Sequence, residues 1–176
     1  MRESIVEPRE KFITLAAGLA AALIGTLIGV QLLGGAALLC ALALIILGCY
    51  EFYRWSLAPV RSVLALIDGG AALLAALICL CNYFGVIFTW EAHLYTFPLW
   101  AIVSGLLKLL RVVQLYRGGE YGWGWMLLCA LLSALAGVLL LILPAAGIMT
   151  MSEFSYMVIG LVLLLHGVHV VVDAFA

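Results

Sequence analysis

Long apolar runs, separated by short breaks rich in glycine, proline or polar residues, make up nearly the whole chain. A helix that crosses about 30 Å of hydrocarbon needs roughly 20 consecutive apolar residues. The pattern meets this requirement six times, which predicts spans at 12–30, 36–54, 61–82, 95–116, 123–143 and 153–174. Pro59 and Pro144 mark two of the breaks. We therefore expect an all-α, polytopic membrane helical bundle.

The composition supports a lipid environment and argues against nucleic acid as a partner. Hydrophobic residues make up 68% of the chain and charged residues only 10%, whereas a soluble domain carries about 25% charged residues. The net charge of −1 leaves no bulk basic surface to neutralise phosphates. The lipid bilayer is the expected partner.

The positive charges predict the orientation of the spans. All eight Lys and Arg residues lie before the first span or around the second and fourth connections, at Arg2, Arg9, Lys11, Arg54, Arg61, Lys108, Arg111 and Arg117. Connections near 31–35, 83–94 and 144–152 contain none. That side is instead expected to carry an aromatic belt at headgroup level, formed by Tyr83, Phe84, Phe88, Trp90, Tyr95, Phe97 and Trp100. Because cytoplasmic loops retain Lys and Arg, both termini are expected in the cytoplasm. The chain then divides into a cytoplasmic N-terminal segment, 1–11, and a six-span membrane domain, 12–176.

The spans also repeat in pairs, which predicts three helical hairpins at about 12–55, 61–117 and 123–176. Each even-numbered span has a glycine near its predicted cytoplasmic end and a polar residue six positions later, as in Gly48 and Arg54, Gly105 and Arg111, and Gly167 and Asp173. The odd-numbered spans have small residues at four-residue spacing, which lets helices approach closely. We therefore expect the odd-numbered spans to pack centrally.

This repeated hairpin, recurring about every 60 residues, resembles the HdeD-like acid-resistance membrane proteins, a family of small six-span bacterial proteins. The resemblance rests on the helix ends at Gly48, Gly105 and Gly167, on the stretch that ends in Pro144, and on the size of the chain. It implies a bacterial inner-membrane protein linked to acid stress. The family is not known for enzymes and provides no catalytic residues to transfer.

Ionisable residues inside spans are costly, at roughly 2.5–3.5 kcal/mol each on insertion scales, and are therefore candidates for a site. Glu51, Asp68, Lys108 and Arg111 all fall in the cytoplasmic third of their spans. Glu51 and Lys108 occupy equivalent repeat positions, which predicts an ion pair between them, while Asp68 is the deepest and most needs a partner. Either an ion-paired structural belt or a proton- or ion-responsive cluster fits this pattern.

His166, His169 and Asp173 follow one another at i, i+3 and i+7, which places them on one face of the last span. An imidazole with a reference pKa of about 6.5 gains charge as the pH falls. A pH-responsive helix is the hypothesis that follows. Metal binding is not expected, because the pair lacks a third ligand at a usable position.

The motifs of hydrolases, metalloproteases, phosphate loops and dinucleotide sites are all missing from the sequence. We expect a protein that is not an enzyme, binds no cofactor and takes part in an acid or envelope stress response. The alternative is a small proton- or ion-coupled channel or transporter that uses Asp68 and Glu51. Self-association, or association with other membrane proteins, is left open.

Overall fold

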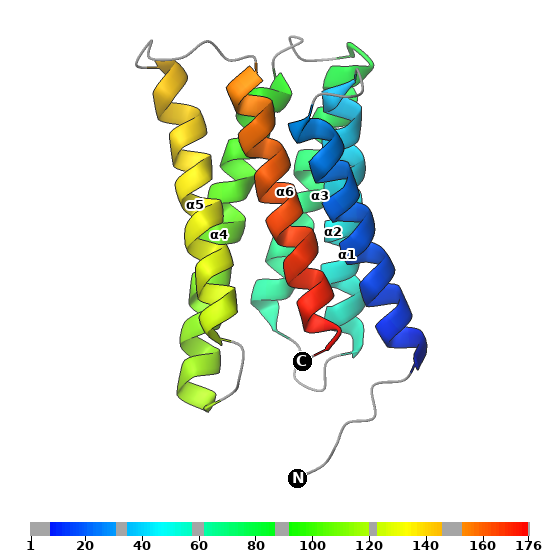
Figure 1. Cartoon of the computed structure of the whole chain (residues 1–176), viewed down its shortest axis with the longest axis vertical. Coiled ribbons are helices and arrows are strands. Elements are labelled where there is room, and N and C mark those ends of the chain that lie inside the picture. The colour runs from blue at the N-terminus through cyan, green and yellow to red at the C-terminus, as the bar shows by residue number, and fades with distance from the viewer. Residues whose placement is uncertain are drawn as a thin grey trace.

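The computed structural model describes residues 8–30, 35–57, 62–86, 92–119, 123–145 and 153–175. These residues form six helices: α1 (Pro8–Gly29), α2 (Ala36–Leu57), α3 (Val63–Tyr83), α4 (Ala92–Gly118), α5 (Trp123–Ala145) and α6 (Glu153–Asp173). The helices run side by side along the long axis of the molecule, and the start of α1 and the end of α6 lie at the same end of the bundle (Figure 1). The predicted all-α bundle is confirmed.

All six described helices are long and apolar enough to cross a membrane. Their bounds agree closely with the predicted spans, and the largest difference is at the start of α1, which begins at Pro8 rather than at residue 12. Proline suits the first turn of a helix because the backbone N–H that it lacks would have no partner there. The helix thus continues past the apolar run through Arg9, Glu10 and Lys11, three polar residues that suit a membrane interface.

The burial pattern fits lipid as the surrounding medium. Large apolar side chains are exposed on every helix, including Leu19, Leu42, Leu77, Leu106, Leu131 and Leu161. The interior instead holds many small residues together with most of the charged residues found inside the spans. Such a distribution is expected where the outer surface faces hydrocarbon and polar groups are satisfied inside the protein. The chain is an integral membrane protein.

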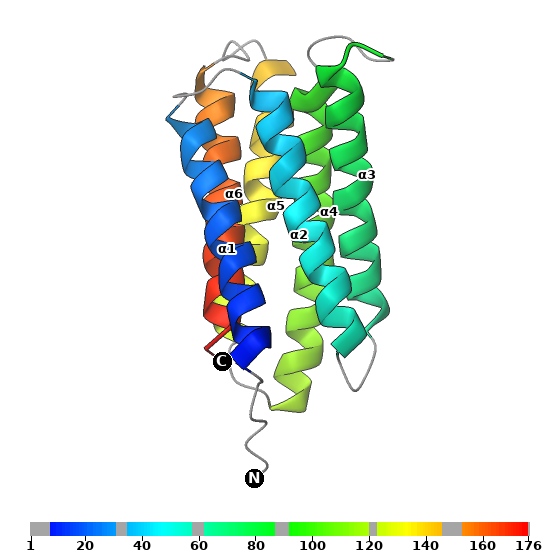
Figure 2. The same cartoon turned by 90° about the vertical axis from the view of Figure 1, so that its right-hand side faces the viewer.

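The predicted hairpins are confirmed, since α1 contacts α2, α3 contacts α4 and α5 contacts α6. The most extensive packing, however, joins neighbouring hairpins: α2 with α3, α4 with α5, and α6 back to α1. Figures 1 and 2 both show α1 and α6 side by side although they lie at opposite ends of the sequence. The three hairpins therefore form a closed ring with approximate three-fold symmetry.

The expectation that the odd-numbered spans are central is wrong. In the described part of the chain, α2, α4 and α6 contact one another, whereas α1, α3 and α5 do not. The small residues of the odd-numbered helices do permit close approach, but to the even-numbered helix of the neighbouring hairpin. A row of small residues shows that a face packs tightly and does not show which side of the bundle that face occupies.

The shared glycines lie at these tight contacts between hairpins. A Cβ atom added to Gly48 would come within 3.0 Å of the Gly69 carbonyl oxygen, and one added to Gly167 would come within 2.6 Å of the Gly18 carbonyl oxygen. At Gly105 the added atom would lie 2.8 Å from the backbone oxygen of Ala130. Because real Cβ atoms do not approach backbone so closely, only glycine allows these helices to pack at this distance.

Candidate functional site

A buried polar site lies where the three even-numbered helices meet, in the half of the bundle that holds the start of α1 and the end of α6. Each even-numbered helix provides the residue one position before its shared glycine and the residue three positions after it. All six positions border one small cavity, with Leu47, Ser104 and His166 before the glycines and Glu51, Lys108 and Val170 after them. The repeat therefore explains why these side chains meet near the axis of the ring.

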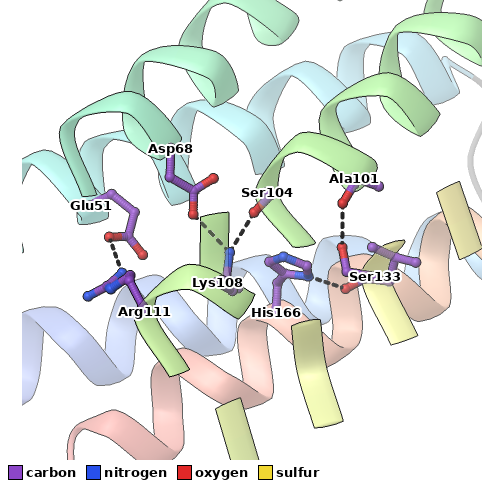
Figure 3. Close-up of polar contacts among 9 residues, drawn as sticks. Glu51, Asp68, Ala101, Ser104, Lys108, Arg111, Ser133 and His166 are labelled. Carbon is purple, nitrogen blue, oxygen red and sulfur yellow. Dashed lines mark hydrogen bonds and ion pairs between the residues drawn. The ribbon is translucent and has the colours of Figure 1, made fainter. Parts of the chain in front are cut away.

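Asp68 and Lys108 form an ion pair inside the bundle (Figure 3). The Lys108 Nζ lies 3.0 Å from Asp68 Oδ2, and the two side chains are only 5% and 4% exposed. Lys108 Nζ also donates a hydrogen bond to the hydroxyl oxygen of Ser104, one turn earlier on α4. Asp68 lies five residues after the start of α3, or about 8 Å along the helix axis. Both charges are thus held within the hydrophobic part of the bundle.

A second ion pair lies closer to the surface. Arg111 Nη1 is 3.3 Å from Glu51 Oε2, and the exposed fractions of the two side chains are 13% and 11%. Arg111 follows Lys108 by three residues on α4, so α4 offers two cations on one face. The four residues expected to form a charged layer therefore come together, with two positive and two negative charges.

The expected pairing of Glu51 with Lys108 is wrong. Helix α3 packs against both α2 and α4 and brings Asp68 to Lys108, while Glu51 pairs with Arg111. The equivalence of Glu51 and Lys108 in the repeat places both beside the cavity but does not decide which charges meet. That choice depends on α3, whose counterparts in α1 and α5 carry no carboxylate at the position of Asp68.

The two histidines of α6 lie in the same site. His166 and His169 are each 4% exposed and both border the cavity. His166 Nδ1 is 2.9 Å from the backbone oxygen of Val162; since a carbonyl oxygen accepts, Nδ1 is the donor. The ring of Trp100 lies 5.1 Å from that of His166, measured between centroids. The side chain of Asp173 lies outside the described residues.

Sequence reasoning missed Ser104 and Trp100. Ser104 precedes Gly105 just as His166 precedes Gly167, so the repeat register contained the signal that places it in the site. The expected place of Trp100 in the aromatic belt, at the opposite end of the spans, is wrong, because its side chain is 4% exposed and borders the cavity. Trp100 precedes Ser104 by four residues and Lys108 by eight, so it lies on the face of α4 that borders the cavity.

Some polar atoms of this site have no hydrogen-bonding partner in the described part of the chain. They are Asp68 Oδ1, His166 Nε2 and Trp100 Nε1, all fully shielded by protein. The cavity beside them has room for about one water molecule. Within the described residues, no cluster of three or more His, Cys, Asp or Glu side chains has the arrangement of a metal site.

The fold and the site together define a six-span helical membrane protein with a buried, charge-balanced polar centre. Comparison with protein-family models, with curated proteins and with solved structures finds no match to this chain. The resemblance to the HdeD-like family therefore remains a prediction from the repeated helix ends.

Proposed function

We propose that this chain is a non-enzymatic inner-membrane protein of bacteria that responds to acid, as its resemblance to the HdeD-like family implies. The observation that carries the proposal is the burial of His166 and His169 beside two ion pairs whose charges cancel. Histidine is the side chain whose unperturbed pKa places its change of charge between pH 5 and 8. Acid stress is thus sensed by adding charge to a site that is balanced at neutral pH.

The position of the site connects protonation to the packing of the helices. A proton on either histidine adds a positive charge near Lys108, while the carboxylates of Asp68 and Glu51 are already paired with cations. At low effective dielectric such repulsion amounts to several kcal/mol over a few Å. The contacts among α2, α4 and α6 are much less extensive than those between neighbouring hairpins. Added charge on the axis therefore acts on the weakest contacts and loosens the centre of the ring.

The distribution of cations supports cytoplasmic termini. Among the described residues, Arg9 and Lys11 lie at the start of α1, Arg54 at the end of α2 and Arg117 at the end of α4. These helix ends all lie at one end of the bundle, together with the end of α6 (Figure 1). With the positive-inside rule, this end faces the cytoplasm, and the histidines monitor cytoplasmic pH.

The size of the cavity favours a regulatory role over catalysis or transport. Room for about one water molecule is too little for an organic substrate in this cavity. The alternative, a proton- or ion-coupled channel that uses Asp68 and Glu51, has less support because both carboxylates are held by cations. Flux measurements with purified protein in liposomes separate the two ideas, since a proton or ion flux abolished by Asp68→Asn favours the channel.

The proposal is tested by following the intrinsic fluorescence of the full chain in lipid nanodiscs between pH 7.5 and 5. Trp100 packs against His166, and an imidazolium quenches indole emission more strongly than a neutral imidazole, so we expect a reversible fall in emission. A His166→Gln, His169→Gln variant should lose this change and should also lower survival after acid challenge. His93→Gln is the matched control, because residue 93 lies at the start of α4, away from the site. An unchanged pH response in the double variant would overturn the proposal.

A further inference from the structure

Asp68 Oδ1, His166 Nε2 and Trp100 Nε1 form a complementary set of hydrogen-bonding atoms. Asp68 Oδ1 is an acceptor, and Trp100 Nε1 is a donor. Because His166 Nδ1 donates to the Val162 carbonyl, Nε2 of the neutral ring carries a lone pair and is a second acceptor. A water molecule has two hydrogens to donate and lone pairs with which to accept, which matches a set of two acceptors and one donor.

Leaving these atoms without partners would be costly. A buried polar group that makes no hydrogen bond destabilises a protein by about 1–3 kcal/mol, and a charged group by more. Buried waters are found where a polar cavity offers about two to four partners and enough room. All three residues border the same cavity, and that cavity has room for about one water molecule.

We infer that one structural water occupies this cavity, donates to Asp68 Oδ1 and His166 Nε2, and accepts from Trp100 Nε1–H. The inference rests on the proposed acid response and identifies where the proton is held. A proton delivered through the water binds to His166 Nε2, which then becomes a donor. The water turns to accept from Nε2–H and continues to donate to Asp68, so that imidazolium, water and carboxylate are hydrogen-bonded in series.

The other groups that face this water set the balance of charge around it. Tyr50 and Glu51 come from α2, Asp68 from α3, Lys108 from α4 and His169 from α6 itself. Helices α1 and α5 provide none of the described residues that border the cavity. Asp68 therefore becomes a carboxylate shared by Lys108 and a protonated His166, which weakens its hold on Lys108.

The test is water-edited solid-state nuclear magnetic resonance on the full chain in lipid bilayers, with nitrogen-15-labelled histidine. Wild type should show transfer of magnetisation from water to His166 Nε2. Ala72→Val adds bulk beside the cavity and should abolish the transfer, whereas Ala75→Val, at a buried position outside the cavity, should keep it. Trp100→Phe keeps an aromatic ring but removes the donor, and should weaken the transfer even if Ala72→Val fails to fold.

The outcomes separate this inference from the proposed function. If His166 Nε2 in the wild type receives no magnetisation from water while the fluorescence still responds to pH, the bound water is refuted and the acid response stands. Equal transfer in wild type, Ala72→Val and Trp100→Phe would also refute it. A wild-type signal that shows bound water but no change between pH 7.5 and 5 would instead overturn the acid response.

Discussion

Replacing Asp68 with asparagine is expected to destabilise the bundle because it leaves the buried charge of Lys108 without an opposite charge. At 3.0 Å and an effective dielectric constant of 20, the attraction in this pair is about 5–6 kcal/mol before desolvation is considered. Removing one partner of a buried pair typically costs about 3–5 kcal/mol. Lys108 keeps its hydrogen bond to Ser104, so we expect the lower end of that range.

The double variant Asp68→Asn, Lys108→Met distinguishes a buried pair from two independent contributions. Methionine keeps much of the length of the lysine stem and removes the charge, so the double variant leaves no unpaired ion in the site. Replacing a complete buried pair by apolar or neutral groups is often close to neutral. We therefore expect the double variant to be more stable than either single variant.

The free energy of unfolding is measured by titration with sodium dodecyl sulfate in mixed micelles, with circular dichroism as the readout. Glu51→Gln is the matched control, because its pair with Arg111 is more exposed and longer. Exposed pairs contribute about 0–1 kcal/mol and buried ones more, so we expect a loss of about 1–2 kcal/mol. If the double variant lowers the free energy of unfolding by the sum of the two single-variant losses, the charges of Asp68 and Lys108 do not interact.

Other substitutions test the packing between hairpins, the polar site at the axis of the ring and the orientation of the protein in the membrane. Gly167→Ala should cost at least about 1–3 kcal/mol because its Cβ would strike the backbone of α1, whereas Gly70→Ala, which meets no atom within 4 Å, should be neutral or stabilising in the same titration. Val170→Lys should cost several kcal/mol by adding an unpaired cation to the site, as judged by unfolding at pH 7.5. In intact cells, a membrane-impermeant maleimide should label Phe84→Cys above the background of the unsubstituted chain and should not label Gly118→Cys. Labelling of Gly118→Cys would show that the protein has the opposite orientation.

The helices could be predicted from the sequence because a bilayer imposes a strict length on each apolar run. Prediction of the start of α1 failed by four residues since a helix need not end where hydrocarbon does. The spacing of the shared glycines in the even-numbered helices could be recognised in the sequence, but the helices that these glycines contact could not. Which faces meet depends on the closure of the ring between α6 and α1, and no local pattern encodes this contact.

The sequence predicted which charged residues form the candidate site but did not predict which of them form ion pairs with one another. Charged residues inside spans are rare and costly, so Glu51, Asp68, Lys108 and Arg111 could be identified from the sequence. Their partners depend on how α3 lies between α2 and α4, which is a tertiary property. Trp100 was misassigned because an aromatic residue suits both a membrane interface and an interior contact.

The approximate three-fold symmetry explains why the site arises where the repeats differ. Equal charges at the three equivalent positions of the even-numbered helices would repel one another close to the axis. Here the three equivalent positions hold Glu51, Lys108 and Val170. Among the described residues of the odd-numbered helices, the carboxylate that borders the cavity is Asp68 of α3. Divergence between repeats therefore replaces repulsion with a neutral set of two pairs.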